Sequence, residues 1–111
     1  MSVSIPIAGK SAHSGERSER ALHVIEAVAN TPLFEHTKIS EEAAPVRIMA
    51  KAEFYNPGGS VKDRPALNMI LDGIDKGKFS KDKVLLDATS GNTGIAYAMV
   101  CAAMGYRAKL C

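Results

Sequence analysis

Cysteine is scarce in this sequence of 111 residues, and the two that it has, Cys101 and Cys111, follow neither metal-ligand nor redox-motif spacing. His23 likewise has no Cys, Asp or second His at ligand spacing, so we expect no metal site. Cysteines without a disulfide pattern are typical of a reducing compartment, and we therefore expect a cytoplasmic protein.

Blocks of like charge and long apolar runs are also missing. The net charge is only +2, and acidic residues are interspersed among the lysines and arginines, which argues against nucleic acid or an anionic membrane surface as a partner. No apolar run reaches the roughly 20 residues needed to span a bilayer. These absences exclude the nucleic-acid-binding and membrane-spanning classes.

The first 45 residues contain little that predicts a folded unit. A chain of 111 residues forms one domain at most, and residues 1–17 are typical of a flexible leader because they are small and polar. Residues 18–45 are predicted to form a helix followed by a loop. The helix should cover 18–29, where Leu22, Ile25 and Val28 recur at helical spacing, and an exposed loop should include 41–45.

Residues 46–111 predict an incomplete α/β domain. The expected elements are, in order, a strand over 46–54, a helix over 63–76, a strand over 84–86 that is covered on both faces, a helix over 93–104 and a strand from 107. This alternation implies a parallel sheet with crossover helices. The helix over 93–104 is apolar almost all round, and so few other elements can hardly bury it; the chain looks unfinished.

One lysine, Lys62, stands at the mouth of the predicted helix over 63–76, within the stretch Tyr-Asn-Pro-Gly-Gly-Ser-Val-Lys-Asp-Arg. The Pro-Gly-Gly part predicts a turn, and Ser60 is expected to cap the helix. A cation is disfavoured beside the positive end of a helix dipole, which leaves more of the free amine that a Schiff base requires. A solvated surface lysine, or a phosphate-binding turn without a covalent role, fits the same pattern.

A second loop, Thr89-Ser90-Gly91-Asn92-Thr93-Gly94, joins a predicted strand end to a predicted helix start. Ligands bind at this place in α/β proteins, and the hydroxyl and backbone N–H groups of the loop can converge on an anion. An ordinary turn followed by a helix cap would use the same residue types.

Together the two loops resemble the cysteine synthase and cystathionine β-synthase family of pyridoxal-phosphate enzymes, which has a tryptophan synthase β-like fold. Residues 51–110 look like the N-terminal part of that family, and Asn30-Thr31-Pro32-Leu33 resembles its upstream signature. The resemblance implies the partial N-terminal portion of a two-domain enzyme of fold type II.

The resemblance also implies roles for individual residues. Lys62 matches the lysine that forms a Schiff base with pyridoxal 5'-phosphate and later removes the α-proton of the substrate, and Asn92 matches the residue that hydrogen-bonds the cofactor ring. The residues that match the loop for the substrate carboxylate are Thr89, Ser90, Gly91, Asn92 and Thr93. The implied reaction, of the transferase or lyase type, is β-replacement on an activated serine such as O-acetylserine, with sulfide or a thiol, to give cysteine. Asp63 and Arg64 also belong to the family pattern, and we expect structural pairing for them.

Two parts of the family site have no counterpart in these 111 residues: the loop that grips the cofactor phosphate and the later residue that meets the pyridine nitrogen. We therefore expect the 111 residues alone neither to hold the cofactor tightly nor to turn over. An inactive fragment or accessory module that associates with a full-length relative, and a small anion-binding α/β module, are the alternatives. The complete enzyme is expected to be a homodimer.

Overall fold

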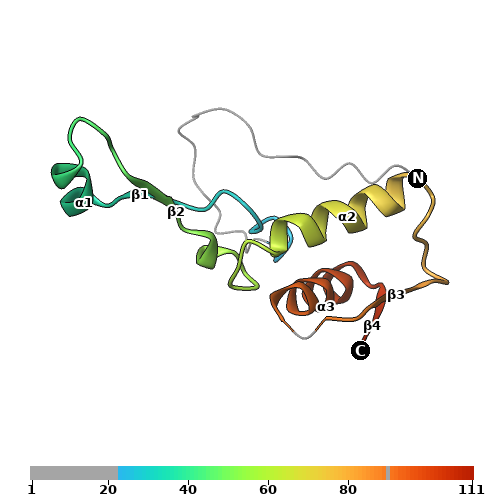
Figure 1. Cartoon of the computed structure of the whole chain (residues 1–111). Coiled ribbons are helices and arrows are strands. Elements are labelled where there is room, and N and C mark those ends of the chain that lie inside the picture. Colours follow the sequence, from blue (N-terminus) through green and yellow to red (C-terminus); the bar gives the residue numbers. More distant parts are fainter. Residues whose placement is uncertain (1–22, 90) are drawn as a thin grey trace, which may run out of the picture.

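The computed structural model describes residues 23–89 and 91–111, so the predicted leader over 1–17 and the first part of the helix expected over 18–29 lie outside the described residues. The elements are β1 (Leu33–Glu35), α1 (Thr37–Glu42), β2 (Met49–Lys51), a 3-10 turn η1 (Glu53–Tyr55), α2 (Asp63–Asp75), β3 (Val84–Asp87), α3 (Asn92–Met104) and β4 (Arg107–Leu110). Figure 1 shows two parts: an arm, residues 33–51, that projects away from a body, residues 63–110.

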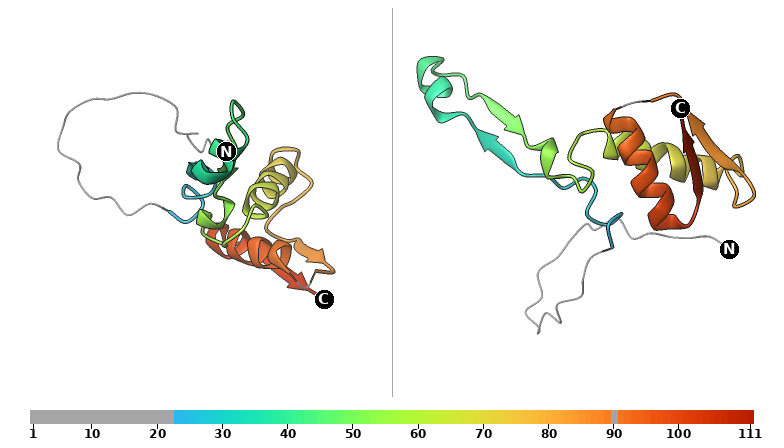
Figure 2. Two further views of the ribbon diagram at one scale, coloured as in Figure 1. Left: turned by 60° about the vertical axis from the view of Figure 1, so that its left-hand side comes forward. Right: turned by 90° about the horizontal axis from the view of Figure 1, so that it is seen from below.

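The body is a β-α-β unit with one further helix packed on it. Strands β3 and β4 pair in parallel, with Val84 opposite Arg107 and Asp87 opposite Leu110, and α3 is the crossover between them. Helix α2 lies along α3 on the side away from the strands (Figures 1 and 2). The mixed α/β class and the parallel pairing are confirmed.

The core lies between α2 and α3. Its buried members are Ala66 and Ile70 from α2 and Ala96, Tyr97, Val100 and Cys101 from α3. The small side chains allow the two helices to approach closely, and the burial of apolar area stabilises the contact. Phe79 and Tyr106 extend this core beyond the helix ends, with ring centroids 4.7 Å apart.

Helices α2 and α3 confirm the expected boundaries. Helix α2 begins at Asp63 and admits Pro65 only in its first turn, where the missing N–H has no intrahelical role. Gly77 follows its last turn with φ of 66°, and Gly105 ends α3 with φ of 68°, a backbone region that glycine enters without steric cost.

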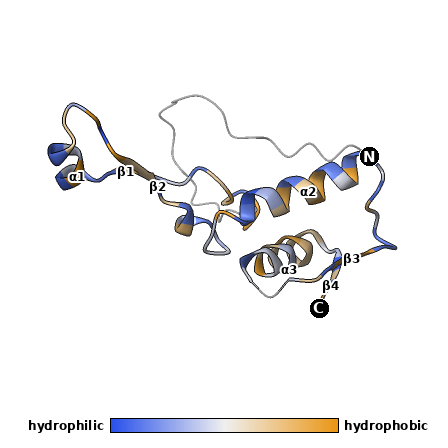
Figure 3. Cartoon of the chain, in the orientation of Figure 1, coloured by the Kyte–Doolittle hydropathy of each residue, from blue (hydrophilic) through white to orange (hydrophobic). Residues whose placement is uncertain are grey.

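Hydrophobic residues occur along the helices and strands of the body (Figure 3), and some of them are exposed in the described part of the chain. Ile95 on α3 is 54% exposed and Leu86 on β3 is 66% exposed, whereas Leu85 packs against the core. The expectation that β3 is covered on both faces is therefore wrong for the described part of the chain, which places helices on one face of the sheet alone.

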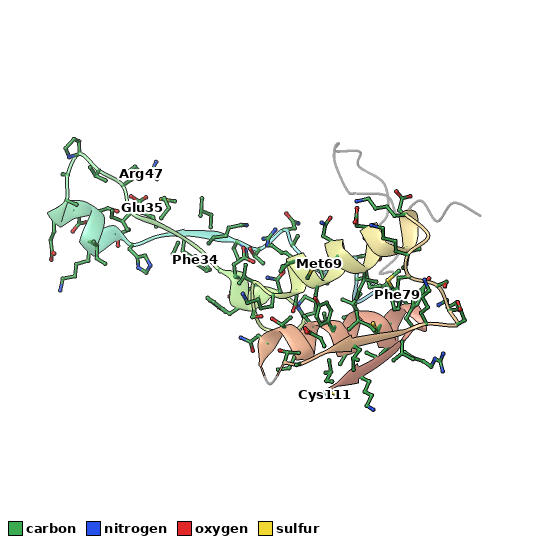
Figure 4. The ribbon with its side chains drawn as sticks, turned by 45° about the vertical axis from the view of Figure 1, so that its right-hand side comes forward. Phe34, Glu35, Arg47, Met69, Phe79 and Cys111 are labelled. Atoms are coloured by element: carbon green, nitrogen blue, oxygen red, sulfur yellow. The ribbon has the colours of Figure 1, made fainter. Side chains whose placement is uncertain are left out.

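The arm is an antiparallel pair of short strands with α1 at its tip. Leu33 of β1 lies opposite Lys51 of β2, and Glu35 lies opposite Met49. Figure 4 shows Glu35 and Arg47 side by side on the arm, and their ion pair is bidentate, with 2.7 Å between Arg47 Nη2 and Glu35 Oε2. The buried Ser40 hydroxyl accepts a hydrogen bond from the Ile48 N–H at 2.8 Å, which ties α1 to the returning chain.

The strand predicted over 46–54 is wrong in extent and in pairing. Only Met49–Lys51 is strand, it pairs antiparallel with β1 in a sheet of its own, and η1 follows it. The alternation of apolar residues does not decide which partner a strand takes, and β1 provides one across the arm. The loop expected over 41–45 also begins too early, since Glu41 and Glu42 belong to α1.

The described part of the helix predicted over 18–29 is not helical. Residues 24–27 form turns, in which the Glu26 N–H donates to the His23 carbonyl and the Val28 N–H donates to the Ile25 carbonyl. Ala29 and Asn30 have φ of 72° and 54°, values incompatible with a continuing right-handed helix. Ile25 and Val28 are nevertheless buried, so the apolar spacing identified inward-facing residues correctly although the backbone is a series of turns.

Candidate functional site

The loop that carries Lys62 runs from Asn56 to Lys62, between η1 and α2. The Gly59 N–H donates to the Asn56 carbonyl at 2.7 Å, which closes the predicted turn, and Gly59 has φ of 80°. The Ser60 hydroxyl accepts a hydrogen bond from the Lys62 N–H at 3.1 Å. The expectation that Ser60 caps α2 is therefore wrong, because the helix begins at Asp63 with Lys62 as its capping residue.

Asp63 fixes the loop from the inside. Its side chain is fully buried, and its Oδ2 accepts a hydrogen bond from the Gly58 N–H at 2.5 Å. A Cβ atom at position 58 would collide with this carboxylate, so the sequence needs glycine there. Oδ1 of Asp63 has no hydrogen-bond partner among the described residues.

Lys62 itself is exposed, with a right-handed helical backbone (φ −66°, ψ −20°). Its carbonyl accepts the Ala66 N–H at 3.1 Å, which commits its main chain to α2. Within residues 23–89 and 91–111 its amine makes no hydrogen bond and no ion pair.

Glu53 anchors the loop at both ends. Arg64 meets it in a bidentate ion pair, with Nε 2.7 Å from Oε2 and Nη2 2.9 Å from Oε1. Asn56 Nδ2 donates to the Glu53 carbonyl and to its Oε2, each at 2.8 Å. Hydrogen bonding by the Arg64 guanidinium holds the pKa of the Glu53 carboxyl below its usual range, and the same pairing raises the pKa of Arg64.

The upstream signature residue Thr31 joins this cluster. Its buried hydroxyl accepts a hydrogen bond from Arg64 Nη2 at 3.1 Å and donates to Glu53 Oε1 at 3.3 Å, while Lys51 Nζ donates to its carbonyl. Asn56 Oδ1 accepts the Ala29 N–H at 2.8 Å. The expected structural pairing of Arg64 is confirmed.

The second loop lies between β3 and α3. Helix α3 begins at Asn92. Gly91 precedes it in an extended conformation and, as a glycine, has no side chain that could cap the helix. Asn92 is exposed, Thr89 and Thr93 are half-buried, and Ser90 lies outside the described residues. The N–H groups in the first turn of a helix have no intrahelical acceptors, so this start is suited to an anion.

The two loops lie at the same end of the body. Helices α2 and α3 begin at the same end of the body and cross obliquely (Figures 1 and 2), and α3 follows the carboxyl end of β3. The hydroxyl of Tyr97, in the middle of α3, donates to the Met69 sulfur, in the middle of α2, at 3.6 Å, so the two helices contact each other near their middles. Lys62 therefore leads into α2 on the side of the molecule where Asn92 opens α3.

Sequence reasoning missed Glu53 as a partner of Arg64. The signal was a charged residue in a stretch expected to be a strand, directly before the Lys62 loop.

No group of three or more His, Cys, Asp or Glu side chains that could hold a metal ion occurs among the described residues. None of the helices described is long and apolar enough to cross a membrane.

The described residues form an α/β protein with Lys62 in the loop that precedes α2. The sequence of residues 24–111 matches the family described as pyridoxal-phosphate dependent enzyme. A cysteine synthase from Aquifex aeolicus (strain VF5) is 54% identical over 89 residues, which are 78% of this chain and 27% of the relative. Cysteine synthase 1 from Emericella nidulans is 48% identical over 82 residues, 74% of this chain and 22% of the relative.

The similarity extends to solved structures. A cysteine synthase from Entamoeba histolytica superposes with a TM-score of 0.75 and 32% identity, over 91% of this chain and 31% of that protein. The chain belongs to the cysteine synthase and cystathionine β-synthase family of pyridoxal-phosphate-dependent enzymes of fold type II. It spans about a quarter of the length of the curated relatives reported above.

Proposed function

We propose that this chain supplies the cofactor lysine and the substrate-carboxylate loop of an enzyme that replaces the β-substituent of an activated serine, such as O-acetylserine, with sulfide or a thiol to give cysteine. The observation that supports the proposal is that α2 and α3 begin at the same end of the body, so that Lys62, which precedes α2, and Asn92, which opens α3, lie at that end. The substrate, the sulfur donor and a homodimeric assembly are parts of this proposal.

The described residues suit pyridoxal phosphate. Lys62 has an exposed amine without a partner in the described part of the chain, and Asn92 is an exposed amide at the other loop. When bound, the cofactor supplies an electron sink for the negative charge that develops on the α-carbon. Lys62 would hold the cofactor covalently, and Asn92 would hydrogen-bond its ring.

The chain's own groups would then perform two tasks. Thr89, Ser90, Gly91, Asn92 and Thr93 would bind the α-carboxylate of the substrate, with the positive end of α3 adding attraction. The amine of Lys62, once released from the cofactor, would take the α-proton as a general base. Fixed placement of both groups raises the rate because it lowers the entropic cost of bringing them together.

The test is covalent labelling of the 111-residue chain by pyridoxal phosphate, fixed by borohydride and located by peptide mass. We expect Lys62 to be labelled in preference to Lys109, an exposed strand residue, at millimolar cofactor, and we expect Lys62→Ala to lose that label. At stoichiometric cofactor we expect no specific absorption band, because these residues alone hold the cofactor weakly, and no cysteine formation. Equal labelling of Lys62 and Lys109 would contradict the proposed role of Lys62.

The carboxylate loop has a separate test. Addition of O-acetylserine should shift the backbone amide resonances of Gly91, Asn92 and Thr93, whereas the methyl ester of O-acetylserine, which lacks the carboxylate, should not. Identical shifts with inorganic phosphate, in a chain whose Lys62 takes no cofactor, would favour a general anion-binding module instead.

A further inference from the structure

We propose that Thr31, Glu53, Asn56 and Arg64 form a latch that positions Lys62 for its reaction with the cofactor, so that the upstream signature acts on the lysine through this network. The inference rests on the proposed function, since it assigns the latch a purpose at the same site. None of the four residues is proposed to touch the substrate; they are positioning residues.

The first argument is the geometry of the attachment. Asn56 opens the loop and Arg64 follows Lys62 by two residues, and both side chains bond to the one carboxylate of Glu53 at 2.7–2.9 Å. A single acidic group therefore closes the loop on itself, with Lys62 inside the closed segment. Thr31 then attaches the closed loop to the segment just before β1, more than twenty residues upstream, through the hydroxyl contacts at 3.1 and 3.3 Å.

The second argument is that Lys62 depends on the loop for its position. Its side chain has no partner among the described residues, so the main chain of the loop sets the region that the amine can reach. The backbone of Lys62 makes hydrogen bonds to Ser60 and Ala66. Ser60 lies in the segment that the latch closes, and Ala66 lies in α2. A displacement of about 1 Å at such a group can cost about 100-fold in rate.

The third argument is the strength and shape of the central pair. The side chains of Arg64 and Glu53 are only 33% and 22% exposed, so solvent screens the pair less than it screens a fully exposed one. A bidentate guanidinium–carboxylate pair fixes orientation as well as distance, and a lysine in place of Arg64 cannot reproduce it.

The arm supplies a matched control. Glu35 and Arg47 form a bidentate pair with the same atoms and similar distances, on β1 and the returning chain, well away from α2 (Figure 4). Glu35→Gln removes the same charge as Glu53→Gln without touching the loop.

The experiment compares hydrogen exchange and cofactor labelling in the unmodified 111-residue chain, Glu53→Gln, Arg64→Lys and Glu35→Gln. We expect Glu53→Gln and Arg64→Lys to speed amide exchange in residues 56–62 by about tenfold or more while exchange in α3 stays unchanged. In the same two variants the ratio of label on Lys62 to label on Lys109 should fall at least to about a third. Glu35→Gln should change neither readout.

Loop exchange and labelling that are unchanged in both latch variants, or changed equally in Glu35→Gln, would overturn the latch. If Glu53→Gln unfolds the body, exchange in α3 rises as well. In that case a comparison of Thr31→Val with the conservative variant Thr31→Ser tests the latch instead. We expect Thr31→Val to loosen residues 56–62 and Thr31→Ser to leave them protected; equal behaviour of the two overturns the latch. Equal labelling of Lys62 and Lys109 in the unmodified chain is a different outcome, because it overturns the proposed function and with it the purpose of the latch.

Discussion

Gly58 lies against the carboxylate of Asp63, and its N–H donates to that carboxylate at 2.5 Å. A Cβ at position 58 would overlap both oxygens, and the buried Asp63 has no room to retreat. We expect Gly58→Ala to lower the free energy of unfolding by about 1–3 kcal/mol, as over-packing does. Urea titration followed by circular dichroism measures this change.

Gly91 provides the control for that substitution. No atom lies within 4 Å of a Cβ built at Gly91, and its φ of −127° is one that any residue adopts. Gly91→Ala should therefore change stability by no more than about 0.5 kcal/mol. A loss from Gly91→Ala as large as that from Gly58→Ala would disprove a specific contact between Gly58 and Asp63.

The two cysteines differ in environment. Cys101 is buried in the core, and burial raises the pKa of its thiol, so little reactive thiolate is present at neutral pH. Cys111 is exposed. We expect a thiol reagent such as Ellman's reagent to modify Cys111 at least about tenfold faster than Cys101 in the native chain, and both at similar rates in urea. Cys111→Ser should remove the fast phase; a fast phase that persists would mean that the core between α2 and α3 is open.

Glu53 makes stability depend on pH. Its pKa is depressed in the folded chain by Arg64, so its contribution is fully present above the unfolded carboxyl pKa of about 4.3 and is lost as the pH falls through the folded value. Acid should therefore destabilise the unmodified chain below about pH 4.3 more steeply than Glu53→Gln. Thermal unfolding at a series of pH values compares the two chains, and parallel curves would contradict the pairing.

At the scale of elements, Lys81 is expected to stabilise the end of α3. Its amine donates to the carbonyls of Met104 and Gly105 and lies 3.7 Å from the centroid of the Tyr106 ring. A cation at a helix C-terminus and over an aromatic face contributes about 0.5–1 kcal/mol at an exposed site. Lys81→Ala should lower the free energy of unfolding by that amount, whereas Lys78→Ala, at an exposed residue of the same loop, should not. If both variants lower the free energy of unfolding equally in urea titration, the loss comes from removal of a positive charge and not from the contacts of Lys81.

The elements of the body could be predicted from the sequence because local signals agree with the tertiary contacts. Pro65 and Gly77 bracket α2, Gly105 ends α3, and the apolar spacing of α2 matches the face that it buries. The same signals predicted that the Lys62 loop lies directly before α2.

The arm and the turns before it could not be predicted, because their contacts join distant residues. The Ala29 N–H is satisfied by the Asn56 side chain, 27 residues later, instead of by a helical carbonyl. Strand β2 takes its antiparallel partner from β1, which is only three residues long. Glu53 is recognised as a site residue only when Arg64 and Thr31 are seen on either side of it.

At the scale of the whole molecule, one helix contact keeps the two loops together. Ile70 of α2 is 2% exposed and packs in the core with Val100 and Cys101 of α3, so this contact decides how the start of α2 lies relative to the start of α3. Leu86, in contrast, is 66% exposed on the outer face of the sheet. Truncation of Ile70 would remove buried packing between α2 and α3, whereas truncation of Leu86 would remove a side chain that is mostly exposed.

Ile70→Ala should therefore cost about 2–4 kcal/mol of stability, as a large-to-small change in a core does, and Leu86→Ala no more than about 0.5 kcal/mol. Because the proposed site needs α2 and α3 to begin at the same end of the body, Ile70→Ala should also reduce the shifts that O-acetylserine causes at Asn92 and the preferential labelling of Lys62, at temperatures where the helices remain formed. Leu86→Ala should leave both unchanged. Loss of stability with an intact response at both loops would show that each loop is built locally, by its own hydrogen bonds, and that the packing of α2 on α3 is not what assembles the site.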